Sequence, residues 1–458
     1  MKTYLFKGLL QEKGWISPAY VTVNKKGKIK TIDTQFNRKH PITKIEGYAL
    51  PSFQNAHSHA FQYAMAGLAE KHDNKKSDDF WSWRNAMYQL ALSITPEQLE
   101  HIATMLYAQM VKNGFTHVAE FHYLHHQPNG SPYPNLAEMG QRLINAAKTV
   151  GINITLIPIF YQMGGFGIPA LEQQKRFISN TIEEYYALLD ASKKACKTYK
   201  GAKLGIGIHS LRGVKGEDII ALSKNEKYTR YPFHIHIAEQ LKEVEDCIQF
   251  YNKRPVEWLL ENIELNERYH LVHATHLTPK ETQGIANSKA NVVLCPSTEG
   301  NLGDGLFPLI DFQKMGGNWS IGTDSHIGIN PLEELRLLDY GQRLVSHKRN
   351  IFNSPTQEDS ALYAVQQAYT NGKKAMGANN ISYFKIGKKL NAVIYSTNEP
   401  LLSTSALKNI PTTILYTQYY PLATICNGKL KNYKGIIKTS NKIQQNFEKS
   451  ILELGNRG

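Results

Sequence analysis

The stretch "GYALPSFQNAHSH", residues 47–59, is an apolar run that ends in two histidines. Seven more runs of this kind follow along the chain, and helical patterns lie between most of them. Strands that alternate with helices pair in parallel. Eight such units in succession predict a (β/α)₈ barrel, the TIM-barrel fold.

The polar residues of these runs gather at their C-terminal ends. In a barrel of this kind those ends converge on one mouth, where catalysis takes place. The further runs are "FTHVAEFHY" (115–123), "INITLIPIFYQ" (152–162), "KLGIGIHS" (203–210), "PFHIHIAEQ" (232–240), "YHLVHATHL" (269–277), "NVVLCPST" (291–298) and "WSIGTDSH" (319–326). We therefore expect one site at the mouth, built from the ends of several strands.

The clearest helix signal lies between the first and second runs. Thr95 is a candidate N-cap, Pro96 takes the first helical position, and Gln98 completes a capping box. Asn113-Gly114 is a stop signal. The pattern predicts a helix from Pro96 to just before Asn113.

Both ends of the chain have the composition of short strands. "AYVTVNKKGKIKTIDT" (19–34) is typical of a hairpin, and "FKIGKKLNAVIYST" (384–397), "TTILYTQYY" (412–420) and "ATICNGKLKNY" (423–433) are β-branched and aromatic runs. We predict that residues 1–50 and 380–458 form one small β-sandwich domain. Residues 51–379 would form the barrel.

The composition is that of a globular protein, with 458 residues, 41% of them hydrophobic and 20% charged. No apolar run is long enough to span a membrane, and no cleavage site follows the first residues. The four cysteines are far apart and form no CxxC motif, which favours a reducing, cytoplasmic location. The net charge is +14, but the lysines are scattered along the sequence. Scattered lysines favour a solvated surface over nucleic-acid binding, and an anionic small-molecule substrate is an equally good use for the positive charge.

His57 and His59 lie two residues apart, so both side chains point to the same side of a strand. A third imidazole and a carboxylate would complete a site for a borderline cation such as zinc. The run at 232–240 offers His236, and the last run offers Asp324. We predict a metal site with His57, His59, His236 and Asp324 as ligands. Imidazole also suits Fe²⁺, so zinc is expected and ferrous iron stays open as the alternative.

These motifs, in this order, resemble the mononuclear deaminase branch of the metal-dependent amidohydrolase superfamily. The resemblance covers nearly the whole chain: HxH on the first strand, HxxE on the fifth, His on the sixth and Asp on the eighth. Members with two metals carry a modified lysine at the end of the fourth strand. Here His209 stands at that place, so one metal per chain is expected.

A closer similarity is to the N-formimidoyl-L-glutamate deiminases of bacterial histidine degradation. Segments that carry it include "NAHSHAFQYAMAGLAE" (55–70), "FWSWRNAMYQ" (80–89), "CPSTEGNLGDG" (295–305) and "GTDSHIGINPLEELRLLDYGQRL" (322–344). The resemblance implies hydrolysis of N-formimidoyl-L-glutamate to N-formyl-L-glutamate and ammonia by a zinc-activated water.

The implied catalytic residues are Glu239, His273 and Asp324. Glu239, which is not a metal ligand, would transfer the proton from water to the leaving nitrogen. His273 would orient the nucleophile or stabilise the tetrahedral intermediate, and Asp324 would also accept a proton.

A dicarboxylate substrate needs cationic partners, and arginine binds carboxylates through two hydrogen bonds. Arg84 and Arg212 are expected in loops at the mouth, and "FWSWRNAMYQL" (80–90) is expected to be a closing loop. The resemblance assigns substrate contacts to Gln62, Arg84, Tyr123, His209 and Arg212.

Three alternatives are weighed. Another mononuclear deaminase of the superfamily would act on a guanine-like or other amidine, but an aromatic base needs stacking side chains more than two guanidinium groups. A non-catalytic metal-binding barrel would not need Glu239 and His273. Nucleic-acid binding would fall steeply with salt. The sequence leaves the oligomeric state open; barrels of this size often pair, and "NPLEELRLLDYGQRL" (330–344) is a candidate contact helix for a homodimer.

Overall fold

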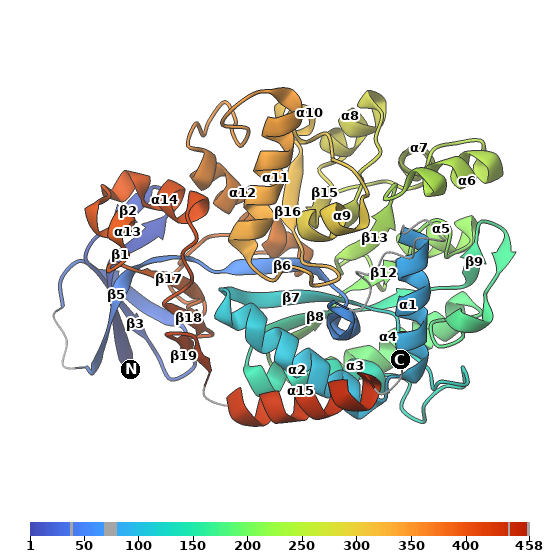
Figure 1. Cartoon of the computed structure of the whole chain (residues 1–458), viewed down its shortest axis with the longest axis horizontal. Coiled ribbons are helices and arrows are strands. Elements are labelled where there is room, and N and C mark those ends of the chain that lie inside the picture. Colours follow the sequence, from blue (N-terminus) through green and yellow to red (C-terminus); the bar gives the residue numbers. More distant parts are fainter. Residues whose placement is uncertain (37–39, 68–79, 438–439, 456–458) are drawn as a thin grey trace.

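A ring of parallel strands forms the centre of the computed structural model, which describes residues 1–36, 40–67, 80–437 and 440–455 (Figure 1). The strands neighbour one another in the order β6 (Phe53–Ser58), β7 (Phe115–His122), β8 (Asn153–Phe160), β12 (Ile206–Ile208), β13 (Phe233–Ile237), β14 (Tyr269–His273), β15 (Asn291–Leu294) and β16 (Asn318–Ile321). An isolated parallel bridge between Ser58 and Asp324 joins the last strand end to the first. The predicted (β/α)₈ barrel is confirmed.

Helices surround this ring, most of them on its outer side and the first of them at the mouth (Figure 1). They are α1 (Phe80–Ser93), α2 (Pro96–Lys112), α3 (Glu138–Val150), α4 (Ile182–Cys196), α5 (Gly216–Lys224), α6 (Leu241–Tyr251), α7 (Pro255–Asn262), α8 (Pro279–Ser288), α9 (Pro296–Leu302), α10 (Leu309–Lys314), α11 (Pro331–Ser346) and α12 (Ser360–Ala375). Short elements between them are η1 (Ala60–Met65), β9 (Met163–Gly165), β10 (Ile168–Pro169), η2 (Glu172–Gln174) and β11 (Ala202–Leu204). Helix α2 has the predicted capping box: Gln98 N donates to Thr95 Oγ1 (3.2 Å), and Thr95 N donates to Gln98 Oε1 (3.1 Å).

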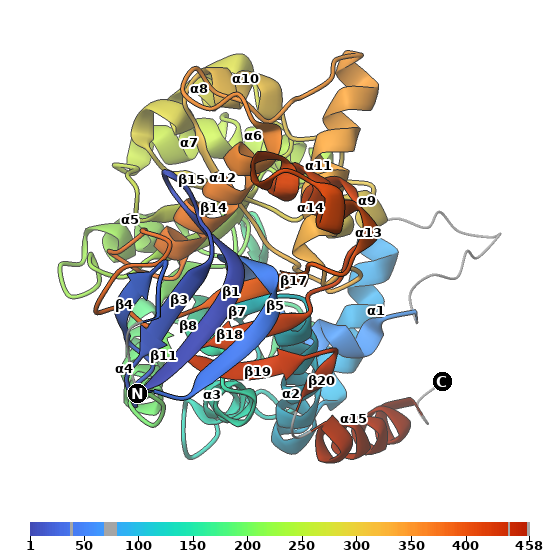
Figure 2. The ribbon, with the colours of Figure 1, turned by 90° about the vertical axis from the view of Figure 1, so that its left-hand side faces the viewer.

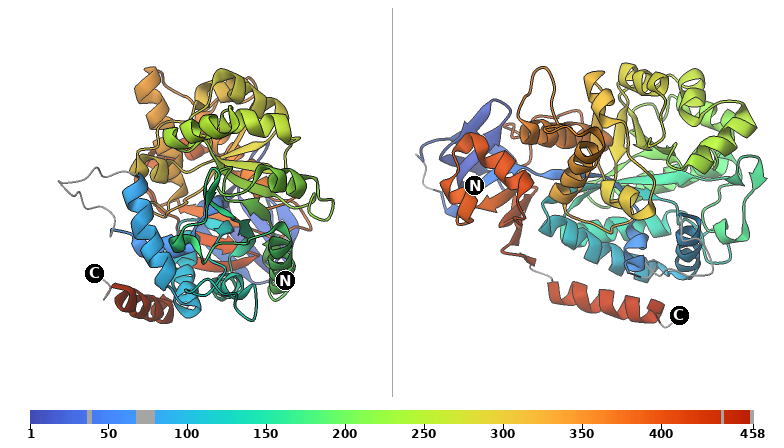
Figure 3. Two further views of the ribbon diagram at one scale, coloured as in Figure 1. Left: turned by 90° about the vertical axis from the view of Figure 1, so that its right-hand side faces the viewer. Right: turned by 45° about the horizontal axis from the view of Figure 1, so that its top comes forward.

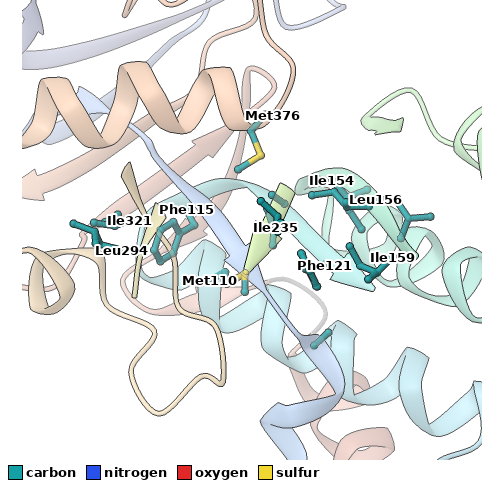
Figure 4. Packing of buried hydrophobic residues seen from close by; sticks show 14 of the residues in the cluster. Met110, Phe115, Phe121, Ile154, Leu156, Ile159, Ile235, Leu294, Ile321 and Met376 are labelled. Carbon is teal, nitrogen blue, oxygen red and sulfur yellow. The ribbon is translucent and has the colours of Figure 1, made fainter. Parts of the chain in front are cut away.

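Buried apolar side chains fill the space between strands and helices (Figure 4). Phe121, Ile159 and Ile235 come from the strands β7, β8 and β13, and Met110 comes from α2. His234 belongs to this packed interior, because its Nε2 lies 3.0 Å from the carbonyl oxygen of Ala375, below the mouth. The interior of the barrel below the mouth is therefore filled by packed side chains.

The two ends of the chain combine into a second, separate sheet, as expected (Figure 2). Its strands follow the order β20 (Ile436–Ile437), β19 (Lys429–Tyr433), β18 (Ala423–Cys426), β17 (Ala392–Ser396), β5 (Ile42–Pro51), β1 (Lys2–Gln11), β3 (Ala19–Val23) and β4 (Ile29–Asp33), with β2 (Gly14–Ile16) on β1. All of them belong to one hydrogen-bonded sheet with its own core, which includes Phe6, Val21 and Ile394. The division at residues 50 and 380 stays a prediction.

Two C-terminal segments differ from the strand pattern. The run at 412–420 was expected to be extended, but α14 (Ile410–Tyr416) occupies most of it, after α13 (Pro400–Thr404) and η3 (Leu407–Asn409). Pro411, at the start of α14, favours this helix, and Ile410, Ile414 and Leu415 bury one apolar face. The last helix, α15 (Ser440–Gly455), leaves the terminal sheet and packs against α2, where Gln98 Nε2 donates to Glu453 (3.0 Å; Figure 3).

No helix within the described ranges has both the length and the apolar character needed to cross a membrane.

Candidate active site

Three imidazoles converge at the mouth of the barrel. His57 lies near the end of β6, His59 follows that strand, and His236 lies near the end of β13. The Nε2 atom of His57 is 3.1 Å from Nε2 of His59 and 3.0 Å from Nε2 of His236. All three side chains are buried. The two distant strands thus bring together the three imidazoles predicted from the sequence.

The second nitrogen of two of these rings fixes their orientation. Nδ1 of His59 lies 2.9 Å from the carbonyl oxygen of Phe121, and Nδ1 of His236 lies 3.2 Å from that of His209. A carbonyl accepts a hydrogen bond, so each Nδ1 carries the proton and each Nε2 presents a lone pair. Burial lowers the pKa of His59 to about 3 and lowers that of His236 as well. Neutral rings whose lone pairs face one another are a suitable donor set for a divalent cation.

Asp324 supplies the carboxylate beside these rings. Its Oδ1 lies 3.3 Å from His59 Nε2 and 3.7 Å from His57 Nε2. The carbonyl of His57 accepts hydrogen bonds from the backbone N–H groups of Thr323 and Asp324, both at 3.1 Å. This backbone contact between the first and last strands holds the carboxylate next to the three imidazoles.

The backbone is strained where strands deliver side chains to this site. Ala238, His273 and Asp324 have φ angles of 50°, 67° and 42°, in the left-handed region that residues with a Cβ atom avoid. Such conformations cost about 1–3 kcal/mol each and cluster at functional sites. They turn the chain sharply at the ends of β13, β14 and β16, so that the side chains point into the mouth.

A group of acidic residues surrounds His273. Its Nε2 lies 3.7 Å from Glu239 and 3.4 Å from Asp324, and its Nδ1 lies 3.2 Å from Glu299. Burial by itself lowers the pKa of His273, but Glu239, Glu299 and Asp324 outweigh it and raise that pKa to about 10. The imidazole can therefore act as a hydrogen-bond donor on both nitrogens, which keeps its position between the carboxylates.

The cavity above the imidazoles is lined by all five residues assigned to the substrate: Gln62, Arg84, Tyr123, His209 and Arg212. Gln62 Nε2 donates to the Tyr123 hydroxyl (2.9 Å). One guanidinium nitrogen of Arg212 lies 4.0 Å from Glu239 Oε2, so a cation stands directly beside the predicted proton-transfer group. The structure brings these residues together, while their roles stay predictions.

Arg84 differs from its expected setting. It was expected in a loop, and "FWSWRNAMYQL" was expected to be a closing loop, but the segment belongs to α1 (Phe80–Ser93). It contains neither glycine nor proline, and Met87, Tyr88 and Ala91 bury one face. The Arg84 guanidinium lies 5.2 Å from the Tyr88 ring centroid. A helix fixes its direction more firmly than a loop would. Arg212 does lie outside the regular elements, after β12.

Several cavity residues escaped the sequence analysis. Gln174 Nε2 donates to the hydroxyls of Tyr88 (3.0 Å) and Tyr161 (2.9 Å), and both tyrosines line the cavity. Tyr161 follows the third barrel strand, so the rule that strand ends carry the site could have identified it. Gln174 lies on η2, far from any strand end, and the sequence held no signal for it.

Glu120 and His326 form hydrogen bonds that hold the end of the first barrel strand, β6, in place. Glu120 accepts hydrogen bonds from the Ser58 hydroxyl (2.8 Å), the Ala60 N–H (2.6 Å) and the Tyr107 hydroxyl (2.9 Å). His326 lies 3.2 Å from the same Ser58 hydroxyl and 2.9 Å from that of Thr323. Since Ser58 stands between the two histidines, these contacts fix the strand that carries both.

His125 and His126 lie near the mouth as well, but their rings contact backbone carbonyl groups and not the three imidazoles. Nε2 of His125 lies 3.0 Å from the carbonyl oxygen of Ile159, and Nε2 of His126 lies 2.8 Å from that of Ile178. Both backbone N–H groups donate to Arg176 O. These contacts tie together the segments that wall the cavity.

Comparison with known proteins agrees with this architecture. A family model described as "Amidohydrolase family" matches residues 48–431. The formimidoylglutamate deiminase of Pseudomonas aeruginosa is 41% identical over 400 residues, which cover 87% of each chain. The crystal structure of an amidohydrolase from Brucella melitensis superposes with a TM-score of 0.92 and 36% identity, over 99% of this chain and all of that one. An adenosine deaminase from Xanthomonas campestris, solved with bound zinc, has a TM-score of 0.81 at 18% identity over 99% of this chain and 98% of its own, and so shares the fold.

Proposed function

The chain belongs to the amidohydrolase family of hydrolases, and we propose that it hydrolyses N-formimidoyl-L-glutamate to N-formyl-L-glutamate and ammonia. The observation that carries this proposal is the position of Arg212, 4.0 Å from Glu239 beside the three converging imidazoles. A cation at that place can hold a carboxylate of the substrate while the formimidoyl group lies at the proton-transfer residue.

His57, His59, His236 and Asp324 would hold one divalent metal ion. The fit rests on the donor set: the tautomers of His59 and His236 aim Nε2 lone pairs inward, and the Asp324 carboxylate adjoins them. Zinc suits three imidazoles and one carboxylate, and ferrous iron is the alternative ion. When bound, such an ion acts as a Lewis acid that makes a water molecule acidic and nucleophilic at neutral pH.

Glu239 would transfer the proton during the reaction. Its carboxylate lies 3.7 Å from His273 and faces the same cavity as the imidazoles. We infer that it takes a proton from the attacking water and delivers it to the imine nitrogen, and that it then passes the hydroxyl proton of the tetrahedral intermediate to the same nitrogen, which leaves as ammonia while the carbonyl forms. His273, held by Glu299 on its other side, would donate a hydrogen bond to the reacting centre and orient the nucleophile. Asp324 is a second proton acceptor, since its Oδ2 faces His273.

Arg84 and Arg212 would bind the two carboxylates of the substrate. Guanidinium groups form the strongest hydrogen bonds with carboxylates, and two of them in one cavity suit a dicarboxylate. Gln62, Tyr123 and His209 supply further polar contacts along the wall. A guanine-like base, the alternative substrate, has no carboxylate that these guanidinium groups could bind. The chain's 41% identity to a formimidoylglutamate deiminase supports the same choice.

A substrate panel tests this proposal. The zinc-loaded protein should give a kcat/KM for N-formimidoyl-L-glutamate at least about a hundredfold above that for guanine or 8-oxoguanine, since two charged contacts are worth roughly 3 kcal/mol together. Equal or better turnover of a purine would reject the dicarboxylate assignment and favour the alternative.

Two further expectations belong to this proposal. We place the enzyme in the cytoplasm, where its four buried free thiols stay reduced.

We also propose a homodimer through α11, whose Leu337, Tyr340, Leu344 and Val345 are exposed apolar residues on one helix. Light scattering of the wild type and of Leu344→Glu tests the dimer, which the charged residue should dissociate.

A further inference from the structure

A second cavity lies at the end of the barrel opposite the catalytic mouth. Its wall includes His117, Asn153 and Lys203, which lie near the N-terminal starts of barrel strands, and Asn391 and Asn427 of the terminal sheet. Its volume is about 650 Å³, within the range of small-molecule sites. It therefore lies between the barrel floor and the terminal sheet, apart from the site proposed above.

Lysine dominates this wall. Six lysines line the cavity: Lys200, Lys203, Lys373, Lys385, Lys388 and Lys389. An adjoining cavity shares Lys200 and Lys389 and adds Lys25, Lys26, Lys28, Lys148, Lys429 and Lys431. No aspartate, glutamate or arginine lines either cavity among the described residues. The lysines are scattered along the sequence, but the fold gathers twelve of them around one connected hollow, which we call the basic cavity.

These ammonium groups have no carboxylate counter-ion among the residues that the structure describes. Within the described part of the chain, none of the twelve has a carboxylate oxygen within 4.0 Å, although exposed lysines elsewhere, such as Lys227 and Lys242, form ion pairs at 2.9 and 2.8 Å. Lys203 Nζ donates to the carbonyl of Gly377 (3.0 Å), a neutral partner. Burial, and then repulsion from Lys203 and Lys388, lower the pKa of Lys373 to about 8. Clustered like charges are unfavourable to the folded protein unless an anion neutralises them.

Neutral donors complete the wall and hold its shape. Asn427 Nδ2 donates to Asn153 Oδ1 (3.0 Å), and Asn427 N donates to Asn391 Oδ1 (2.7 Å). These bonds join the start of β8 to the terminal sheet, so barrel and sheet present one continuous polar surface. The cavity is thus formed before any ligand binds.

We propose that the basic cavity binds a small anion with several linked phosphate groups, an oligophosphate that is either free or part of a nucleotide. Lysine ammonium groups bind phosphate oxygens as point charges, whereas planar carboxylates favour arginine. Many unpaired charges along two joined hollows suit a chain of phosphates better than a single anion.

Single-stranded nucleic acid fits less well, because it needs aromatic faces for stacking. Tyr369 instead packs edge-on against Tyr383, with centroids 5.0 Å apart, and donates its hydroxyl to Ser382 O.

Calorimetric titration of the zinc-loaded full chain tests the site, with tripolyphosphate as the probe at physiological ionic strength. Tripolyphosphate should bind one per chain, at least about tenfold more tightly than orthophosphate or sulfate, because each added phosphate meets further ammonium groups. ATP is the second probe. Equal binding of ATP would assign the phosphate chain of a nucleotide, and weaker binding would assign a free oligophosphate.

Two variants locate the binding. Lys388→Gln/Lys389→Gln removes exposed lysines, so folding should be unaffected, and tripolyphosphate should bind about tenfold or more weakly. Lys373→Gln should weaken it similarly. The matched control Lys224→Gln/Lys280→Gln, which removes two exposed lysines outside the basic cavity, should change the Kd less than about twofold. The kcat/KM for the amidine substrate should stay within about twofold in all three variants, because none touches the mouth.

Three results would overturn the proposal: no preference of the wild type for tripolyphosphate over orthophosphate, equal weakening by the control and cavity variants, or displacement of tripolyphosphate by a single-stranded oligonucleotide that binds more tightly.

Discussion

The Nε2 atoms of His57 and His236 lie 3.0 Å apart, although the two residues are separated by 179 positions and belong to different strands. His236 keeps its proton on Nδ1, which donates a hydrogen bond to the carbonyl of His209, so its Nε2 lone pair faces His57. Burial lowers the pKa of both rings, which disfavours a charged imidazolium at either position. A divalent cation bound to both nitrogens, as proposed above, would stabilise two neutral rings this close together.

The first prediction concerns the proposed metal ligands. His59→Ala should reduce the metal content of purified protein from about one ion per chain to a small fraction of that, because three ligands hold zinc far less tightly than four. Elemental analysis after dialysis against a weak chelator measures this. His101→Asn, on the remote helix α2, is the control and should keep the metal. Full occupancy in His59→Ala would remove this residue from the ligand set.

Glu239→Gln separates proton transfer from metal binding. The amide keeps the size of the side chain but cannot accept a proton, so kcat should fall by about 10²–10⁴ while metal content is unchanged. Stopped-time ammonia assays and elemental analysis of the same samples provide both values. Glu245→Gln, an exposed neighbour on α6, should behave as wild type. Near-normal turnover in Glu239→Gln would show that another group transfers the proton.

Arg212→Met tests recognition of the substrate carboxylate. Loss of a charged hydrogen bond should lower kcat/KM for N-formimidoyl-L-glutamate by about 10–100-fold, and should affect an uncharged formimidoyl amine much less. The exposed Arg230→Met controls for the loss of one positive charge. If both substrates lose activity equally, Arg212 acts on the reacting centre and not on the carboxylate.

Glu334 links stability to pH. Burial raises its pKa from 4.5 to about 8, although hydrogen bonds from the Ser297 N–H and hydroxyl oppose the shift. The folded state therefore favours the neutral carboxyl. That stabilisation is complete below pH about 4.5 and is lost as the pH rises through about 8, with a slope of up to about 1.4 kcal/mol per pH unit.

Denaturant unfolding between pH 5 and pH 9 measures this dependence. Glu334→Gln, which cannot ionise, should flatten the decline in the free energy of unfolding, whereas the exposed Glu358→Gln should leave it unchanged. An identical slope in wild type and Glu334→Gln would mean that other groups control stability in this range.

The sequence alone predicted those site residues whose positions follow from the two-residue period of a strand and from the ends of the barrel strands. The two-residue period placed His57 and His59 on one side of a strand, and the positions of His236 and Asp324 at other strand ends placed them at the same mouth. Arg84 was misplaced in a loop because its long, aromatic segment follows the first strand as a closing loop would, whereas the segment is a helix that buries Met87 and Tyr88.

Features that depend on distant segments were beyond sequence reasoning. Gln174 reaches two tyrosines from separate elements, and no local pattern indicates that contact. The lysines of the basic cavity appear scattered along the chain, and they meet only once the terminal sheet docks on the barrel floor. Tertiary proximity, and not spacing, determines both features.

The most direct test of the proposed function is the hydrolysis itself. Purified protein, stripped with a chelator and reloaded with one equivalent of zinc, should convert N-formimidoyl-L-glutamate to equal amounts of ammonia and N-formyl-L-glutamate, as measured by mass spectrometry and an ammonia assay. The stripped protein should be inactive until zinc is returned. Absence of ammonia release from the fully metal-loaded protein, or full activity of the stripped protein, would contradict the account.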